Sequence, residues 1–112
     1  MPETYLVKDD VAVQLEIEML FSQYGKTDVY LDMEPIVKGH EGNLTYMLKT
    51  GSQLSTKDLF INTLMKDVRS ETNKLGVCVR LTGGMKTYEE EFTKTVNQEG
   101  KTHRFICDIT FL

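Results

Sequence analysis

The sequence predicts an α+β domain in which two helices pack on one face of a mostly antiparallel sheet. Apolar residues recur at helical spacing in two segments and alternate with period two in five others. The predicted order is helix-strand-strand-helix-strand-strand-strand. No repeat and no Pro/Gly/Ser-rich linker interrupts the chain, so residues 1–112 are predicted to form a single α+β domain.

The first predicted helix begins at Asp9 or Asp10 and ends at Gly25. Acidic residues at its start suit the positive end of a helix dipole, and glycine is a common helix stop. Its apolar stripe, at i, i+4, i+7, i+8 and i+11, consists of Val13, Ile17, Leu20, Phe21 and Tyr24.

The second predicted helix begins near Ser55, because Ser55 and Asp58 have the spacing of a capping box. Asn73 or Gly76 ends it. The residues expected on its apolar face are Ile61, Leu64, Met65 and Val68. The stripes of both helices are expected to cover the apolar face of the sheet.

Residues 29–37 and 44–48 each alternate with period two, which predicts two strands. The turn signal Gly39–Asn43 between them predicts a hairpin. Pro35 indicates an edge or a bulge, because proline cannot donate a ladder hydrogen bond.

Three further strands follow the second helix. Residues 77–81 alternate up to the turn signal Gly83-Gly84, and a more polar strand covers residues 88–96. Residues 105–111 show the cleanest alternation in the chain. We expect this last strand to be locked into the sheet.

The net charge of −4 is confined to residues 1–25, where five carboxylates stand against one lysine. The first predicted helix is therefore acidic, and its Glu16 and Glu18 are candidate interface residues. Phosphate recognition needs a clustered basic surface, so we expect no specific nucleic-acid binding. A basic or self-complementary protein surface is the better partner.

No catalytic, cofactor-binding or metal-binding constellation stands out. Cys78 and Cys107 fall in apolar runs, which should bury a free thiol and raise its pKa. His40 and His103 have no second histidine or cysteine at metal-ligand spacing. We therefore predict no enzyme, no cofactor and no metal.

The chain shows neither a signal-peptide pattern nor a run near the ~20 apolar residues of a membrane span. These observations predict a protein of the reducing cytoplasm, without membrane association and without a disulfide.

The strand at residues 88–96 carries the other candidate interface. Alternation places Glu90 on the face of Tyr88 and Phe92, and Glu89 and Glu91 on the opposite face. Because Glu90 interrupts a half-apolar face, this strand is predicted not to pack fully within the monomer, and to serve as an interface arm. Alternatively, the acidic run is a solvated strand edge whose charge prevents aggregation.

The element order, with its closing strand KTHRFICDITFL, resembles the tail-terminator, or tail-completion, proteins of long-tailed bacteriophages. The resemblance covers topology and length. It implies a homohexameric ring that caps the tail tube, other virion proteins as partners, and a place in the host cytoplasm and the virion. The family's DNA passage tends to be acidic, which would give Glu89, Glu90 and Glu91 a role.

A second interpretation is a small cytoplasmic inhibitor or regulator that binds a basic host protein through its acidic surface. Charge complementarity between two surfaces steers such an association. A small-molecule-binding domain has weaker support, because the sequence shows no convergent polar cluster.

Overall fold

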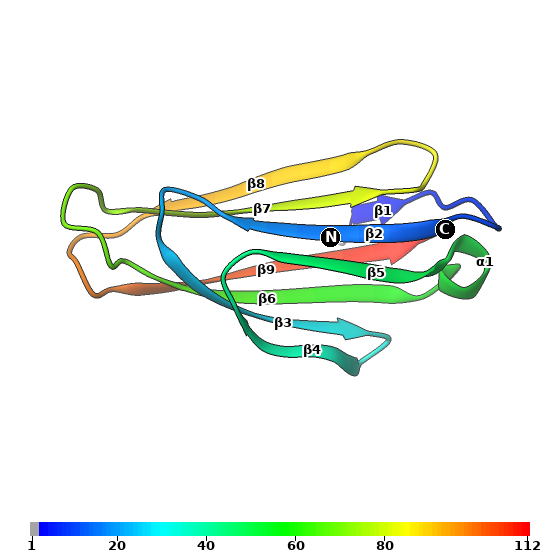
Figure 1. Ribbon diagram of the computed structural model, residues 1–112, viewed down its shortest axis with the longest axis horizontal. Coiled ribbons are helices and arrows are strands. Elements are labelled where there is room, and N and C mark those ends of the chain that lie inside the picture. The colour runs from blue at the N-terminus through cyan, green and yellow to red at the C-terminus, as the bar shows by residue number, and fades with distance from the viewer. Residues whose placement is uncertain (1–2) are drawn as a thin grey trace.

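Two facing β-sheets make up the computed structural model, which describes residues 3–112 (Figure 1). The molecule is elongated, with principal extents of 46 × 25 × 24 Å. The elements in chain order are β1 (Glu3–Tyr5), β2 (Ala12–Met19), β3 (Tyr24–Leu31), β4 (Glu34–Glu41), β5 (Leu44–Thr50), α1 (Gly51–Leu54), β6 (Asp58–Lys66), β7 (Lys74–Thr82), β8 (Tyr88–Thr95) and β9 (Thr102–Phe111).

Sheet A has five strands in the order β1-β9-β6-β3-β4, and sheet B has four in the order β5-β2-β7-β8. All neighbouring strands are antiparallel except β1 and β9, which are parallel. The chain passes repeatedly from one sheet to the other, so most pairings join segments far apart in the sequence.

The predicted α+β fold is wrong, because both predicted helices are strands. In β2, Val13, Leu15 and Ile17 are buried while the residues between them face outward. In β6, Leu59 and Ile61 are buried in the same alternating way. In a strand, this alternation puts every second side chain on the same buried face. In a helix, residues two positions apart would lie on different faces. The protein is a mostly-β sandwich.

The helical turn α1, the one helix in residues 3–112, lies outside both predicted helices. The Thr50 N–H donates a hydrogen bond to Gln53 Oε1 at 3.1 Å, as in a capping box. Ser55, predicted to open a helix, instead lies at the C-terminal cap of α1, and Asp58 begins β6.

Residues 29–37, predicted as one strand, form a hairpin. The backbone turns at Asp32 and Met33, both with positive φ, so that β4 runs back along β3. Pro35 lies on β4, an edge strand with an irregular register, as predicted. The predicted hairpin around Gly39–Asn43 is wrong, because β4 belongs to sheet A and β5 to sheet B.

The last three predicted strands are confirmed as β7, β8 and β9. Gly83 and Gly84 lie in the turn between β7 and β8, which pair along their length. The last strand is locked into sheet A, since β9 lies between β1 and β6. However, β8 and β9 belong to different sheets and do not form a hairpin.

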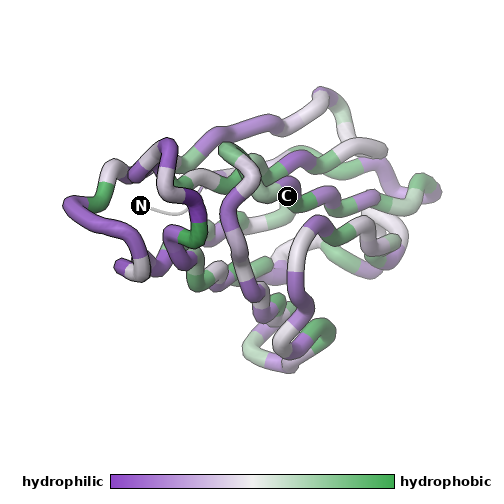
Figure 2. The backbone as a smooth tube through the Cα atoms, turned by 60° about the vertical axis from the view of Figure 1, so that its left-hand side comes forward, coloured by the Kyte–Doolittle hydropathy of each residue, from purple (hydrophilic) through white to green (hydrophobic). Residues whose placement is uncertain are grey.

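One core fills the space between the sheets. Figure 2 shows hydrophilic and hydrophobic residues alternating along the strands, as a sandwich with one buried face per sheet requires. Within residues 3–112, no helix is long and apolar enough to cross a membrane. The largest fully buried side chains include Leu15, Ile17, Leu59, Ile61, Met65, Leu75, Leu81, Ile109 and Phe111.

The resemblance to tail-terminator proteins rested on an element order with two helices. In residues 3–112 both of those segments are strands, so that element order is absent. The assignment to that family therefore loses its topological basis.

Two substitutions in β6 distinguish the strand from the predicted helix. The helix would bury Ile61 and Leu64 on one face, whereas the strand buries Ile61 (1% exposed) and leaves Leu64 37% exposed. We expect Ile61→Ala to lower the free energy of unfolding by about 2–5 kcal/mol, because it leaves a cavity. Leu64→Ala should cost less than about 1 kcal/mol. Urea denaturation measures both, and equal losses would contradict the strand.

Candidate functional site

The outer face of sheet B gathers charged residues from β2, β7 and β8 into adjacent rows. Glu16, Arg80 and Glu89 are cross-strand neighbours in one row. Arg80 donates from Nη1 to Glu16 Oε2 at 3.1 Å and from Nε to Glu89 Oε1 at 2.6 Å. In the next row, Cys78 lies between Glu18 and Glu91. We call Glu16, Glu18, Arg80, Glu89 and Glu91 the acidic face.

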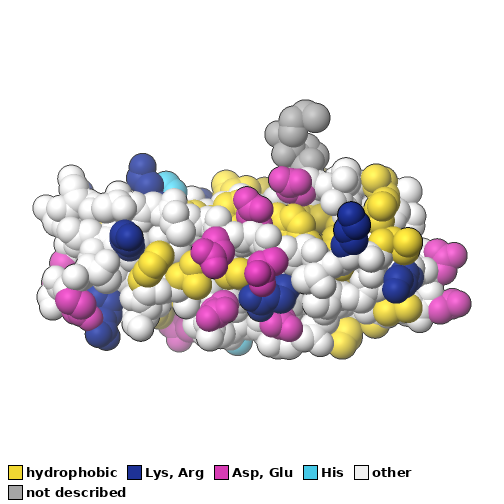
Figure 3. Space-filling model, turned by 90° about the horizontal axis from the view of Figure 1, so that it is seen from above, with side chains coloured by type: hydrophobic (Ala, Val, Ile, Leu, Met, Phe, Trp, Pro, Cys, Tyr) yellow, Lys and Arg dark blue, Asp and Glu magenta, His cyan; other side chains and the backbone are white. Residues whose placement is uncertain are grey.

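The acidic face is only partly neutralised. Hydrogen bonds from Arg80 to Glu89, and then to Glu16, raise the pKa of the guanidinium and keep it charged. Within residues 3–112, Glu18 and Glu91 form no ion pair. Figure 3 looks down on the side where β7 and β8 lie, and shows acidic side chains gathered around a basic group. Four carboxylates and one guanidinium therefore present a negative surface.

The structure divides the predicted interface residues into two groups. It brings Glu16, Glu18, Glu89 and Glu91 together, although they come from opposite ends of the chain. The other three predicted interface residues face the inner side of sheet B, because their cross-strand partners on β7 are the inward-facing residues Leu81, Val79 and Val77. These three are Tyr88, Glu90 and Phe92.

Tyr88 and Phe92 are half-buried and pack against the core, so β8 is an edge strand integrated into this monomer. The Tyr88 hydroxyl lies 3.8 Å from Cys107 Sγ, and burial raises the pKa of Tyr88. Glu90 is exposed between the two aromatic residues. An interface that uses β8 therefore has only its outer face and its free edge available.

The predicted burial of both cysteines is confirmed, and both are free thiols. Burial raises the pKa of Cys107 to about 11, and burial also raises the pKa of Cys78. A thiol with a raised pKa is mostly protonated near neutral pH and is a poor nucleophile. In the part of the chain that the structure describes, no group of three His, Cys, Asp or Glu residues is placed to hold a metal ion.

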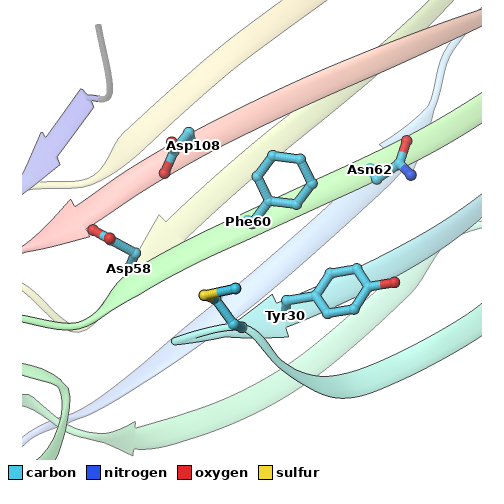
Figure 4. Close-up of a pocket in the computed structure, with 6 residues that line it drawn as sticks. Tyr30, Asp58, Phe60, Asn62 and Asp108 are labelled. Carbon is cyan, nitrogen blue, oxygen red and sulfur yellow. The ribbon is translucent and has the colours of Figure 1, made fainter.

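A second feature, which the sequence did not reveal, lies on the outer face of sheet A. It is an open hollow of about 440 Å³ over β3, β6 and β9 (Figure 4). Tyr30, Phe60 and Asp108 form a cross-strand row along its floor. The rings of Tyr30 and Phe60 lie 6.2 Å apart between centroids. The full lining is Tyr30, Met33, Asp58, Phe60, Asn62 and Asp108.

The two carboxylates of the hollow lie to one side of the Phe60 ring (Figure 4). Asp58 Oδ1 accepts a hydrogen bond from the Thr110 hydroxyl at 2.7 Å. Neither Asp58 nor Asp108 forms an ion pair with a lysine or arginine of residues 3–112. The hollow thus combines an aromatic floor with two carboxylates that no ion pair within residues 3–112 neutralises.

The hollow was missed because β6 was predicted as a helix. Asp58, Phe60 and Asn62 occupy alternate positions, which places them on one face of a strand but on different faces of a helix. No family model matches the chain, and no curated protein or solved structure matches it.

The protection of the thiols has a measurable consequence. With the pKa of Cys107 near 11, its thiolate fraction at pH 8 is far below that of an unfolded cysteine. We expect disulfide-exchange reagents to label the native protein about 100-fold more slowly than the urea-unfolded protein at pH 8. The native rate should rise with pH up to about 11, because deprotonation generates the reactive form.

Absorbance of the released thiol measures both rates, and a Cys78→Ser variant isolates the signal of Cys107. A native rate at pH 8 close to the unfolded rate would show that the Cys107 thiol is exposed and activated.

Proposed function

We propose that the protein is a non-enzymatic binding and assembly module that docks a basic protein surface on its acidic face. The observation that supports this proposal most strongly is the convergence of Glu16, Glu18, Glu89 and Glu91 on one side of sheet B. Folding brings them together although they lie far apart in the sequence, and only Arg80 among the face residues opposes their charge.

The shape of the acidic face favours a protein partner over a small ligand. It is the outer surface of a sheet, and its charged residues do not line any of the hollows described for residues 3–112. Its negative charge disfavours the binding of nucleic acid, since phosphates and carboxylates repel one another. Charge complementarity with a basic surface would increase the rate of association and select among partners.

The same charge restricts how copies of this chain can assemble. Two acidic faces repel one another, so a dimer with twofold symmetry about this face is disfavoured. A homo-oligomer that uses the acidic face must place it against a different surface of the next copy. Such head-to-tail contacts close into rings or extend as filaments, and the predicted ring assembly needs this kind of contact.

A titration with decalysine tests the docking role of the acidic face. We expect backbone amide NMR shifts to move chiefly in β2, β7 and β8, and binding to weaken as salt increases. Replacing Glu18 and Glu91 together with glutamine should weaken binding about tenfold, because it removes the two unpaired charges. Arg80→Gln should tighten binding, because it removes the opposing positive charge.

The matched control is the double variant Glu34→Gln and Glu99→Gln, which removes two exposed charges elsewhere and should leave decalysine binding at the acidic face unchanged. Shifts spread evenly over the protein, or equal weakening in both double variants, would rule out the acidic face as a specific site. Light scattering on the same samples reports whether the partner is a further copy of this chain.

A further inference from the structure

The turn at the rim of the hollow contains a residue that the fold alone does not favour. Asp32 and Met33 form the two-residue loop between β3 and β4, with φ of 49° and 69°. Such loops prefer glycine at the second position, because a side chain is strained at positive φ. Met33 occupies that position and is also 92% exposed. The positive φ of Met33 costs stability, and its exposed side chain gains none from burial in the core.

An exposed methionine on a binding surface has a known physical use. Its thioether is polarizable and its chain flexible, so it adapts to the apolar groups of a partner. Strained backbone also tends to lie at functional sites, where binding depends on the strained geometry. Because Met33 lines the same hollow as Phe60 and the two aspartates, it extends the apolar part of one recognition surface.

The polar part of the hollow fits a guanidinium group. Asp58 and Asp108 lie on neighbouring strands, offset by two positions, because Asp58 pairs with Thr110 and Asp108 with Phe60. Diagonal neighbours of this kind are about 7–8 Å apart at Cα, which leaves room for a planar group between their carboxylates. Arginine offers five donors in one plane and stacks on an aromatic ring, here that of Phe60.

A partial precedent for this chemistry lies beside the hollow, at its lining residue Tyr30. Lys38 Nζ lies 5.0 Å from the centroid of the Tyr30 ring and donates a hydrogen bond to the Tyr30 hydroxyl at 2.7 Å. Lys38 also pairs with Asp28 at 3.6 Å, so its charge is already matched. The Phe60 ring and the carboxylates of Asp58 and Asp108 have no such internal cation in residues 3–112.

We propose that this hollow binds an arginine side chain of a partner polypeptide, with an apolar neighbour of that arginine packed on Met33. Asp58 and Asp108 accept hydrogen bonds from the guanidinium, Phe60 stacks beneath it, and Met33 contacts the adjacent apolar residue. Because the hollow is open rather than enclosed, it suits a side chain presented by a protein better than a small molecule, which binds in a deeper cavity. The site is on the opposite sheet from the acidic face and does not depend on it.

Three capped tripeptides test the proposal: Ac-Leu-Arg-Leu-amide and its analogues with lysine or citrulline at the centre. Citrulline has nearly the shape of arginine but no charge. We expect the arginine peptide to shift amides of β3, β6 and β9, and to bind about tenfold more tightly than the citrulline peptide. The lysine peptide should bind with intermediate affinity, because it lacks the planar group. Equal affinity for arginine and citrulline would overturn the proposal.

Variants of the protein then locate the site. Asp108→Asn and Phe60→Leu should each weaken arginine-peptide binding about fivefold or more. The control Glu99→Gln, in a distant turn, should not. Amide spectra establish that each variant is folded. If both hollow variants bind the peptide as tightly as the unmodified protein, the site lies elsewhere and the proposal fails.

Met33→Gly separates a binding role from a structural one. Because glycine relieves the strain at positive φ, this variant should raise the melting temperature by about 4 °C. It should at the same time weaken arginine-peptide binding, since the apolar contact is lost. A variant that is more stable and binds equally well would show that Met33 takes no part in recognition. A loss of stability would show that Met33 supports the fold instead.

Discussion

Each sheet of this sandwich can bury only one of its two faces, and this limit decides where the charged side chains lie. The inward residues of β2 and β7 form the core, so their outward neighbours Glu16, Glu18 and Arg80 must stand on the surface. A slip of one residue in β2 would exchange the two sets and bury both glutamates. The core therefore fixes the register, and the register fixes the acidic face and the row of residues beneath the hollow.

The sequence predicted the later strands well and the two central ones poorly, for a reason visible in β2. Val13 and Ile17 are four residues apart, a spacing that shares a face in a helix and equally in a strand. The deciding residue is Leu15, which is apolar and buried as strand alternation requires. In β6, Leu59 and Ile61 give the same signal. β9 was predicted correctly because its apolar residues alternate over nearly its whole length.

In the candidate sites too, local sequence patterns identify single residues, whereas the pairing of distant strands decides which of these residues meet. Glu16, Glu18, Glu89 and Glu91 were selected from the sequence as charged features, but their meeting on one face depends on pairing through β7, which no local pattern reveals. The sequence predicts that Tyr88 and Phe92 lie on an incompletely packed interface arm; both are half-buried, and the core that they pack against is built largely from distant strands. The hollow forms only when β6 pairs with both β3 and β9, which places Phe60 between Tyr30 and Asp108.

The position of β9 inside sheet A also affects the order in which the protein can fold during synthesis. Within residues 3–112, β1 pairs only with β9, and β9 also pairs with the other edge of β6. Until β9 has emerged from the ribosome, β1 lacks the strand with which it pairs and β6 keeps an unpaired edge. A nascent chain would therefore expose apolar strands until β9 emerges, and chaperones bind such exposed strands. Sheet A can therefore close only after β9, the last of its strands in chain order, has emerged.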